Sequence, residues 1–596
     1  MTAGRRPPGP PVATETRVPS AAMTTLDLLI TSATIVDGSG APATTGDIGI
    51  RDGRIVAVGT VDEPAVDTID AAGLVACPGF IDLHTHYDAQ LMWDGGASPS
   101  GGHGVTTVIG GNCSFGLAPI DPTNAPYLRE LLAKVEGMPV DALERGADWA
   151  WRDFGSYLDA LEGRLAVNAG FLVGHSTLRR LAIGADANGR PSTPDELERV
   201  RALLDASLAQ GALGLSIDVS EYHSDGDGRP VPAKGADRHE LLALAAVVGE
   251  HPGTTLEGIF AGASAGFDDE EAELMAALSV AADRILNWNV LVVDAASPER
   301  IEAHLLPSRV ARARGGRVVA LTMPVIVPMN MSFGTYCALN LLPGWGEVLN
   351  LPLAERTATL GDPEVRARLL AGASGDVGMF NRLTDFARYR IGDTFSEANA
   401  GLTGRLVEDV AAERDIEPFD CLVDIVLADD LRTVLWPSPT DDDDAHWALR
   451  QALWDDEDVL LGGSDAGAHL DRMCGGPYPA QFLADCLRGR RLVPLERAVQ
   501  MLTDAPARLL GLVDRGRLEP GGHADIVLFD PETIDAGPSR LAHDLPGGSV
   551  RLTADPVGIE RVLVGGVTTI IDGRPTGATP GTTLRSGRDT RTVPVG

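Results

Sequence analysis

Lysine is nearly absent from this chain of 596 residues, in which Lys134 and Lys234 are the only two. The basic residues are otherwise arginines, and 49 Lys and Arg stand against 84 Asp and Glu, so the formal net charge is −35. Such a chain offers little to neutralise a phosphate backbone, which excludes nucleic acid as a partner. We interpret the negative charge as a means of staying in solution.

Long apolar runs and paired cysteines are also missing. No run approaches the roughly 20 residues of a membrane span, so we expect no membrane partner. The six cysteines are widely spread and form no Cys-x-x-Cys pair, which argues against a disulfide framework in a chain this long. Residues 1–24 are rich in Pro and Arg without the apolar core of an export signal. We expect a disordered tail there, and a cytoplasmic protein.

Both ends of the remaining chain are rich in β-type residues. Two such segments precede residue 60, joined by a tight turn at Asp52-Gly53, and two more lie beyond residue 515. We therefore predict one small β-sandwich built from residues 25–73 and 511–585, followed by a tail at 586–596. The chain ends would then lie near each other.

The middle of the chain, residues 74–510, alternates short apolar runs with helical patterns. This alternation predicts a (β/α)8 barrel, whose chemistry sits at the C-terminal ends of its strands. A doubly wound open sheet is the alternative. The eight candidate strands are residues 74–77, 105–109, 167–173, 212–217, 255–259, 285–293, 318–322 and 459–461.

A long insertion, residues 324–457, separates the last two candidate strands. Insertions of this length are often lids over a site. Its methionines and aromatics either line a pocket for an apolar group or pack a small core of the insertion itself. These residues are Met329, Met331, Phe333, Tyr336 and Trp345.

The segment Gly-Phe-Ile-Asp-Leu-His-Thr-His, residues 79–86, contains the strongest functional signal. His84 and His86 are two residues apart, and alternate side chains of an extended strand point the same way. Two imidazoles that converge just past a buried strand suit one divalent cation. A chance spacing of two among twelve histidines is the alternative.

Polar residues follow three other candidate strands. Cys113 lies in a Gly-rich turn, where it is either a thiolate ligand for zinc or a small buried thiol. His175 either contacts metal or substrate or caps the next helix. Asp465, in Gly-Gly-Ser-Asp, can bind metal and accept a proton from an activated water, or serve as a plain helix cap.

Five segments carry a family resemblance: residues 78–88, 104–113, 173–179, 463–466 and 516–530. In them the chain resembles the amidohydrolase superfamily, and within it the branch of N-acyl-D-amino-acid deacylases. The resemblance implies a distorted barrel beside a β-sandwich, and zinc-assisted hydrolysis of an amide. It makes His84 and His86 metal ligands, Asp465 a ligand and general base, and Cys113 the replacement for a bridging carboxylated lysine. The lysine shortage agrees, since neither lysine follows a candidate strand.

The chain departs from its branch at two strand ends. Related deacylases carry a histidine after strands 5 and 6, where this chain reads Leu-Glu-Gly-Ile (256–259) and Asn-Trp-Asn-Val (287–290). We expect Glu257 to replace one ligand and Asn289 to offer a weak oxygen or a substrate contact. One or two zinc ions are expected, with another divalent metal as the alternative.

The preferred hypothesis is hydrolysis of a C–N bond in a small molecule by metal-activated water, with an N-acyl-D-amino acid as the leading substrate. His175 would stabilise the oxyanion, and Arg179 is the candidate for a substrate carboxylate. Two alternatives remain: a cyclic amide or imide hydrolase, and a catalytically silent relative that binds a ligand. The sequence also leaves open whether the chain forms a homo-oligomer.

Overall fold

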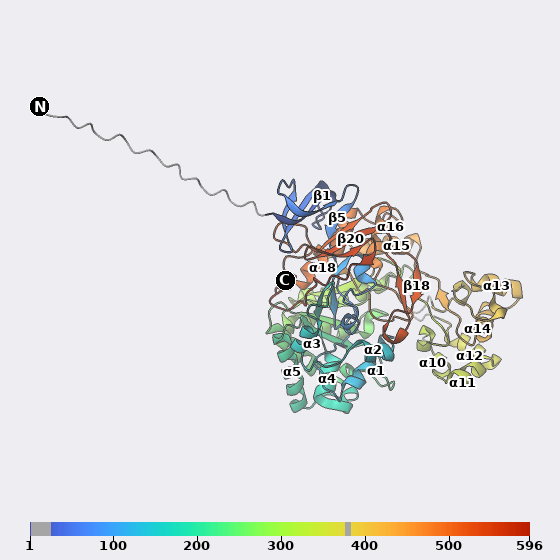
Figure 1. Ribbon diagram of the computed structural model, residues 1–596. Helices are drawn as coiled ribbons and strands as arrows, with labels where there is room; N and C mark the ends of the chain where they lie inside the picture. The colour runs from blue at the N-terminus through green and yellow to red at the C-terminus, as the bar shows by residue number, and fades with distance from the viewer. Residues whose placement is uncertain (2–24, 336, 376–382, 596) are drawn as a thin grey trace.

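The computed structural model describes residue 1 and residues 25–335, 337–375 and 383–595. The predicted tail at 1–24 therefore lies almost wholly outside the described residues. Strands from the two ends of the chain share one sheet, in the order β22-β21-β20-β17-β5-β1-β2-β3, with β4 beside β1 (Figure 1). Its strands are β1 (Leu26–Ile35), β2 (Thr44–Arg51), β3 (Arg54–Gly59), β4 (Ala65–Asp70), β5 (Val75–Pro78), β17 (Ile526–Phe529), β20 (Ile559–Val564), β21 (Val567–Ile571) and β22 (Arg574–Pro575). A β unit built from both ends is thus present, while the second layer of a sandwich stays a prediction.

The structure corrects the first predicted barrel strand. β5, predicted as that strand, pairs with β1 and β17 in the terminal sheet. The chain then breaks at Pro78-Gly79, and β6 (Phe80–Asp82) starts a different sheet. Residue 79 must be a glycine at this break, because a Cβ there would clash with the Thr106 hydroxyl at 2.0 Å.

Parallel strands follow one another in chain order through the middle of the molecule. β6, β7 and β8 form one sheet, and β9, β10, β11, β12, β13 and β16 form a second. Only Leu172 separates β8 from β9, and an isolated parallel bridge joins Thr85, after β6, to Ala466, after β16. The C-terminal strand ends therefore face a common centre. The remaining bounds are β7 (Val105–Gly110), β8 (Asn168–Phe171), β9 (Val173–Gly174), β10 (Gly214–Val219), β11 (Thr255–Phe260), β12 (Leu286–Trp288), β13 (Val318–Thr322) and β16 (Val459–Leu461).

Helices connect these strands and bury one face each. α5 (Pro194–Ala209) begins at a capping box of Thr193 and Glu196 and buries Val200, Leu204 and Leu208, which are spaced four apart on one face. The other helices of this part are α1 (Ala125–Val135), α2 (Val140–Gly146), α3 (Phe154–Leu161), α4 (His175–Ile183), α6 (Arg238–Gly249), α7 (Asp269–Ala282), α8 (Glu299–His304), α9 (Leu306–Ala313), α16 (Tyr478–Leu487), α17 (Leu495–Leu502) and α18 (Asp504–Leu510).

The insertion packs a core of its own, and in Figure 1 its helices α10 to α14 project to one side. Met331, Phe333 and Trp345 are buried in that core, and Met329 packs against it. Met331, Phe333 and Trp345 therefore fill the insertion. Met329 also lines a pocket with Trp436 and Trp447, and Tyr336 lies outside the described residues. The elements are α10 (Trp345–Leu349), α11 (Leu353–Leu360), α12 (Pro363–Gly372), β14 (Tyr389–Ile391), α13 (Val407–Arg414), α14 (Pro418–Ala428), β15 (Leu435–Pro437) and α15 (Asp444–Leu453).

The described chain is thus a mixed α/β molecule with parallel strands at its centre. A last hairpin, β18 (Ser539–Ala542) with β19 (Arg551–Ala554), lies between this centre and the insertion in Figure 1. No helix within the described residues has the length and apolarity needed to cross a membrane.

Candidate metal centre

His84 and His86 lie just beyond β6 and are held by the neighbouring strand ends. The backbone N–H of Thr85 donates to Ile109 of the β7 strand, and that of His86 donates to Ala466, on the opposite side. Both imidazoles are buried, at 0% and 5% exposure, with ring centres 5.3 Å apart. The predicted convergence of the two rings is therefore present.

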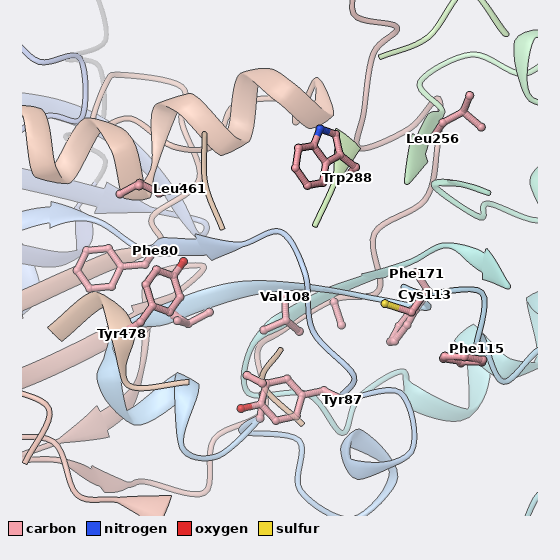
Figure 2. Close-up of a cluster of buried hydrophobic side chains, with 14 of the residues drawn as sticks. Phe80, Tyr87, Val108, Cys113, Phe115, Phe171, Leu256, Trp288, Leu461 and Tyr478 are labelled. Carbon is pink, nitrogen blue, oxygen red and sulfur yellow. The ribbon is translucent and has the colours of Figure 1, made fainter. Parts of the chain in front are cut away.

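Cys113 brings a thiol to the same point from the turn after β7. Its backbone is left-handed, with φ 50°, and the Asn112 amide fastens the turn by donating to the Thr85 and Ile109 carbonyls. Cys113 Sγ lies 3.5 Å from His84 Nε2, and Figure 2 shows the thiol in the buried centre beside Phe115. Ligand atoms of His84, His86 and Cys113 all lie within 4.8 Å of one another, and the described residues contain no other such group of three.

Asp465 approaches from the turn after β16. Its Oδ1 lies 3.0 Å from His86 Nε2 and 3.6 Å from His84 Nε2, and its Oδ2 lies 3.3 Å from His469 Nε2. Burial acts to raise the pKa of this carboxyl, but contacts with the three histidines outweigh burial and hold the pKa well below its usual range. Asp465 is therefore ionised, and its side chain keeps 26% exposure on the open side of the cluster.

Each of the paired histidines presents its second nitrogen to a buried glutamate. His84 Nδ1 lies 3.6 Å from Glu257 Oε1, and His86 Nδ1 lies 3.3 Å from Glu136 Oε1. A carboxylate on one ring nitrogen directs the other nitrogen to a metal, as is usual for metal-binding histidines. Here both Nε2 atoms face Cys113 or Asp465, so the two glutamates occupy the outer side of the rings.

The cluster contains buried acidic groups that its hydrogen bonds do not fully stabilise. Burial, with smaller effects from Asp218 and Asp465, raises the pKa of Glu257 to about 8. Burial and the charge of Glu257 also raise the pKa of the Cys113 thiol well above its usual value. Buried atoms without a hydrogen-bond partner include His84 Nδ1, Glu136 Oε1, Glu257 Oε1 and Asn289 Oδ1. Two imidazoles, a thiol and a carboxylate are the ligand types of zinc, so the donor set fits such a cation.

Glu257 and Asn289 lie at this centre, on β11 and just after β12. Glu257 Oε2 accepts the Cys113 backbone N–H at 3.0 Å, so this carboxylate supports the thiol turn as well as His84. Asn289 Nδ2 lies 3.3 Å from His84 Nε2 and 3.9 Å from Cys113 Sγ. The two positions that lack the branch's histidines therefore still face the cluster.

The structure does not bring His175 and Arg179 to the cluster. His175 Nε2 bonds Glu240 at 2.8 Å, and Arg179, also fully buried, donates to Glu240 and to three backbone carbonyls. Arg179 is thus a structural cation, and this corrects the prediction that it contacts a substrate carboxylate. His175 begins α4, and its imidazole is engaged by Glu240 and not aimed at an oxyanion.

Sequence reasoning missed Glu136, His469 and the pair Asp218–His223. Glu136 follows α1 in the chain, far from any strand end, and nothing in its neighbourhood signals a site. His469 had a signal, because it follows Asp465 by four residues in the same Gly-rich turn. Asp218 lies at the end of β10 and His223 just after it, and polar side chains at the C-terminal end of a parallel strand are expected to reach a site there.

Comparisons with known proteins agree with this geometry. Residues 67–576 match the amidohydrolase family. The chain is 30% identical to D-aminoacylase of Alcaligenes xylosoxydans xylosoxydans over 515 residues, which cover 85% of this chain and 89% of the relative. It is 29% identical to N-acyl-D-aspartate deacylase of the same organism over 518 residues, covering 85% and 86%.

Solved structures of related enzymes share the fold of this chain. A crystal structure of D-aminoacylase has a TM-score of 0.61 at 26% identity and covers 94% of this chain and 100% of that chain. N-acyl-D-glutamate deacylase from Bordetella bronchiseptica, complexed with zinc and a phosphonate inhibitor, has the same TM-score at 24% identity and equal coverage, and shares the fold. The protein is a metal-dependent hydrolase of carbon–nitrogen bonds other than peptide bonds. The chain therefore belongs to the amidohydrolase family.

Proposed function

We propose that this protein removes the acyl group from N-acyl-D-amino acids, and that it uses a divalent cation, most simply zinc. The observation that carries the proposal is the buried convergence of His84, His86 and Cys113 with Asp465 beside them. The relatives supply the substrate class, since their names are D-aminoacylase, N-acyl-D-aspartate deacylase and N-acyl-D-glutamate deacylase.

The proposed cation site uses the Nε2 atoms of His84 and His86, Cys113 Sγ and Asp465 Oδ1. A cation held there supplies a Lewis acid, which polarises a carbonyl and lowers the pKa of water. Glu257 and Glu136 orient the two imidazoles through their Nδ1 atoms. One ion suffices for these four ligands. A study of D-aminoacylase describes activation by one metal and attenuation by a second, which supports a single ion as the working state.

Asp465 is the proposed general base. It is ionised, keeps an open side, and lies against both metal histidines, so it can accept the proton of an attacking water. The same carboxyl then donates this proton to the departing nitrogen, which leaves as a neutral amine. His469, on the other carboxylate oxygen, fixes the direction of the carboxylate. Asn289 is placed to hydrogen-bond the substrate beside His84.

The proposal includes a closed barrel. β6 to β13 and β16 run parallel in chain order, only one residue separates the two sheets at β8 and β9, and the bridge from Thr85 to Ala466 links the first of these strands to the last. These contacts support a distorted (β/α)8 barrel that closes around the histidine pair.

The test is hydrolysis of N-acetyl-D-amino acids by zinc-loaded protein, with the L-enantiomers as the matched control. We expect free D-amino acid to appear, no release from the L-series, and about one zinc per chain by elemental analysis. A panel of acidic, aliphatic and aromatic side chains should be used. If metal-loaded protein releases no amino acid from any member of that panel, the proposal is wrong.

A further inference from the structure

A second buried acid, Asp218 on β10, and a histidine, His223 in the segment after this strand, stand next to the cluster. Ser216 and Asp218 share one face of this strand because side chains alternate along it. Ser216 Oγ accepts the backbone N–H of Ser114, the residue after Cys113, at 3.0 Å. This face of β10 therefore looks onto the Cys113 turn, and Asp218 continues it toward the C-terminal strand end.

Asp218 fixes the orientation of His223. Its carboxylate is fully buried, and Oδ2 accepts from His223 Nδ1 at 2.7 Å. The other oxygen accepts the backbone N–H and the hydroxyl of Ser220, at 2.8 and 2.7 Å. With Nδ1 bound to the carboxylate, His223 Nε2 points away from Asp218, and the described residues provide no hydrogen-bond partner for it.

His223 lies beside the cluster and not within it. Its ring stands edge-on to Phe115, two residues after Cys113, with centroids 5.2 Å apart, and its side chain keeps 16% exposure. Burial lowers the pKa of His223, but the charge and hydrogen bond of Asp218 raise it, with added effects of Glu136 and Asp465, and the net direction is upward. A protonated imidazole can donate from Nε2.

Other cations near the cluster are already engaged. Arg179 is bound to Glu240 and carbonyls, and Arg472 donates to Asp471, His469 and the Val135 carbonyl. His469 lies between Asp465 and Arg472, so both of its ring nitrogens have partners. Of the two lysines, Lys134 is exposed on α1 and Lys234 belongs to the short helix Pro232–Gly235.

We propose that His223, held by Asp218, binds the carboxylate of the substrate. This inference rests on the proposed function, because an N-acyl amino acid carries its carboxylate on the carbon next to the scissile nitrogen. When the substrate carbonyl lies at the cation, its carboxylate extends past the metal ligands. A residue that lies beside those ligands, as His223 does, can then contact it. The Nε2–H would supply a charge-assisted hydrogen bond in a site otherwise rich in acid.

The experiment compares two substrates that differ only at this group: an N-acetyl-D-amino acid and its C-terminal primary amide. We expect the wild type to prefer the acid. His223→Gln should raise KM for the acid about 10- to 100-fold, the range of one charge-assisted hydrogen bond, and leave kcat/KM for the amide within about twofold. Asp218→Asn should move the same preference in the same direction by less.

His251→Gln is the matched control, because His251 also pairs with an aspartate, Asp205, but on the exposed surface. It should change neither substrate. Equal losses on acid and amide in His223→Gln, or no loss on either, would overturn the inference while leaving the deacylase proposal intact.

A binding measurement separates the two proposals if the wild type hydrolyses neither compound. Zinc-loaded Asp465→Asn protein, with and without His223→Gln, is titrated with the acid and the amide by calorimetry. Tighter binding of the acid that disappears with His223 would support the carboxylate site even though the deacylase proposal had failed. Equal affinity for the two compounds would overturn the carboxylate site.

Discussion

Two buried clusters of charge stand at neighbouring strand ends of this molecule, and they are built in opposite ways. Around Glu240 every charge has its partner: one oxygen accepts from His175, the other from Arg179 and Ser192, and the guanidinium also donates to three carbonyls. Around His84 and His86, acids crowd one another and several buried polar atoms have no hydrogen bond.

The difference separates a structural cluster from a functional one. Pairing with His175 and Arg179 overcomes burial and lowers the pKa of Glu240 to about 2, so the charges of this network are completely paired, although His175 Nδ1 has no hydrogen-bond partner. In the other cluster burial raises the pKa of Glu257 to about 8, which shows how little positive charge offsets it. Charge pairing in this cluster is incomplete, so a bound cation would stabilise it, and the following variants test that distinction.

The largest expected effect is on turnover. Asp465→Asn keeps the size of the side chain but removes the base, so kcat on an N-acyl-D-amino acid should fall about 10³-fold. Circular dichroism should change little. Zinc should still bind at saturating concentration through His84, His86 and Cys113, with lower affinity because the charged oxygen ligand is lost. The exposed Asp195→Asn on α5 is the control and should retain full activity. A loss of less than tenfold in Asp465→Asn would remove it from the role of general base.

Breaking the complete cluster should cost stability and leave the metal site alone. Arg179→Met leaves Glu240 buried without its strongest partner, which should lower the free energy of unfolding by about 3–5 kcal/mol. Zinc content per folded chain should equal that of the wild type. Arg180→Met, next to it but stacked on Tyr127, should have a much smaller effect in the same denaturant titration. Loss of zinc in Arg179→Met would show that the clusters are one unit.

Adding the cation should stabilise only the incomplete cluster. Zinc at a hundred times its dissociation constant should raise the free energy of unfolding by about 2.7 kcal/mol, and a chelator should reverse the gain. Cys113→Ser should lose most of this gain, whereas Cys486→Ser, another buried cysteine, should keep it. A wild type whose thermal unfolding does not respond to zinc would contradict the metal centre.

The sequence placed the proposed ligands better than their surroundings. His84, His86, Cys113 and Asp465 could be placed because each follows an apolar strand, and parallel strands end at one edge. Most strand positions from β7 onward were close, but residues 167–173 are divided between β8 and β9 in two sheets, and the predicted strand 285–293 is only β12, Leu286–Trp288. Residues 74–77 went to the terminal sheet because pairing with β1 and β17 is not visible in local pattern. Glu136 and Glu240 escaped for the same reason, since Glu136 lies 50 residues after His86 and Glu240 lies 65 residues after His175. His223 escaped although its partner Asp218 is only five residues before it.

The smallest expected effect decides whether Glu257 binds the cation or holds the histidine that does. Glu257→Gln keeps an oxygen to accept the Cys113 N–H but removes the charge behind His84 Nδ1, so zinc affinity should fall 10- to 100-fold, the usual effect of an outer partner of a metal-binding histidine. Glu136→Gln, its counterpart behind His86, should fall within the same range. Competition with a chromophoric chelator measures both. A loss as large as that of Cys113→Ser would make Glu257 a direct ligand, and no loss would leave its buried, raised-pKa carboxyl without a part in the metal centre.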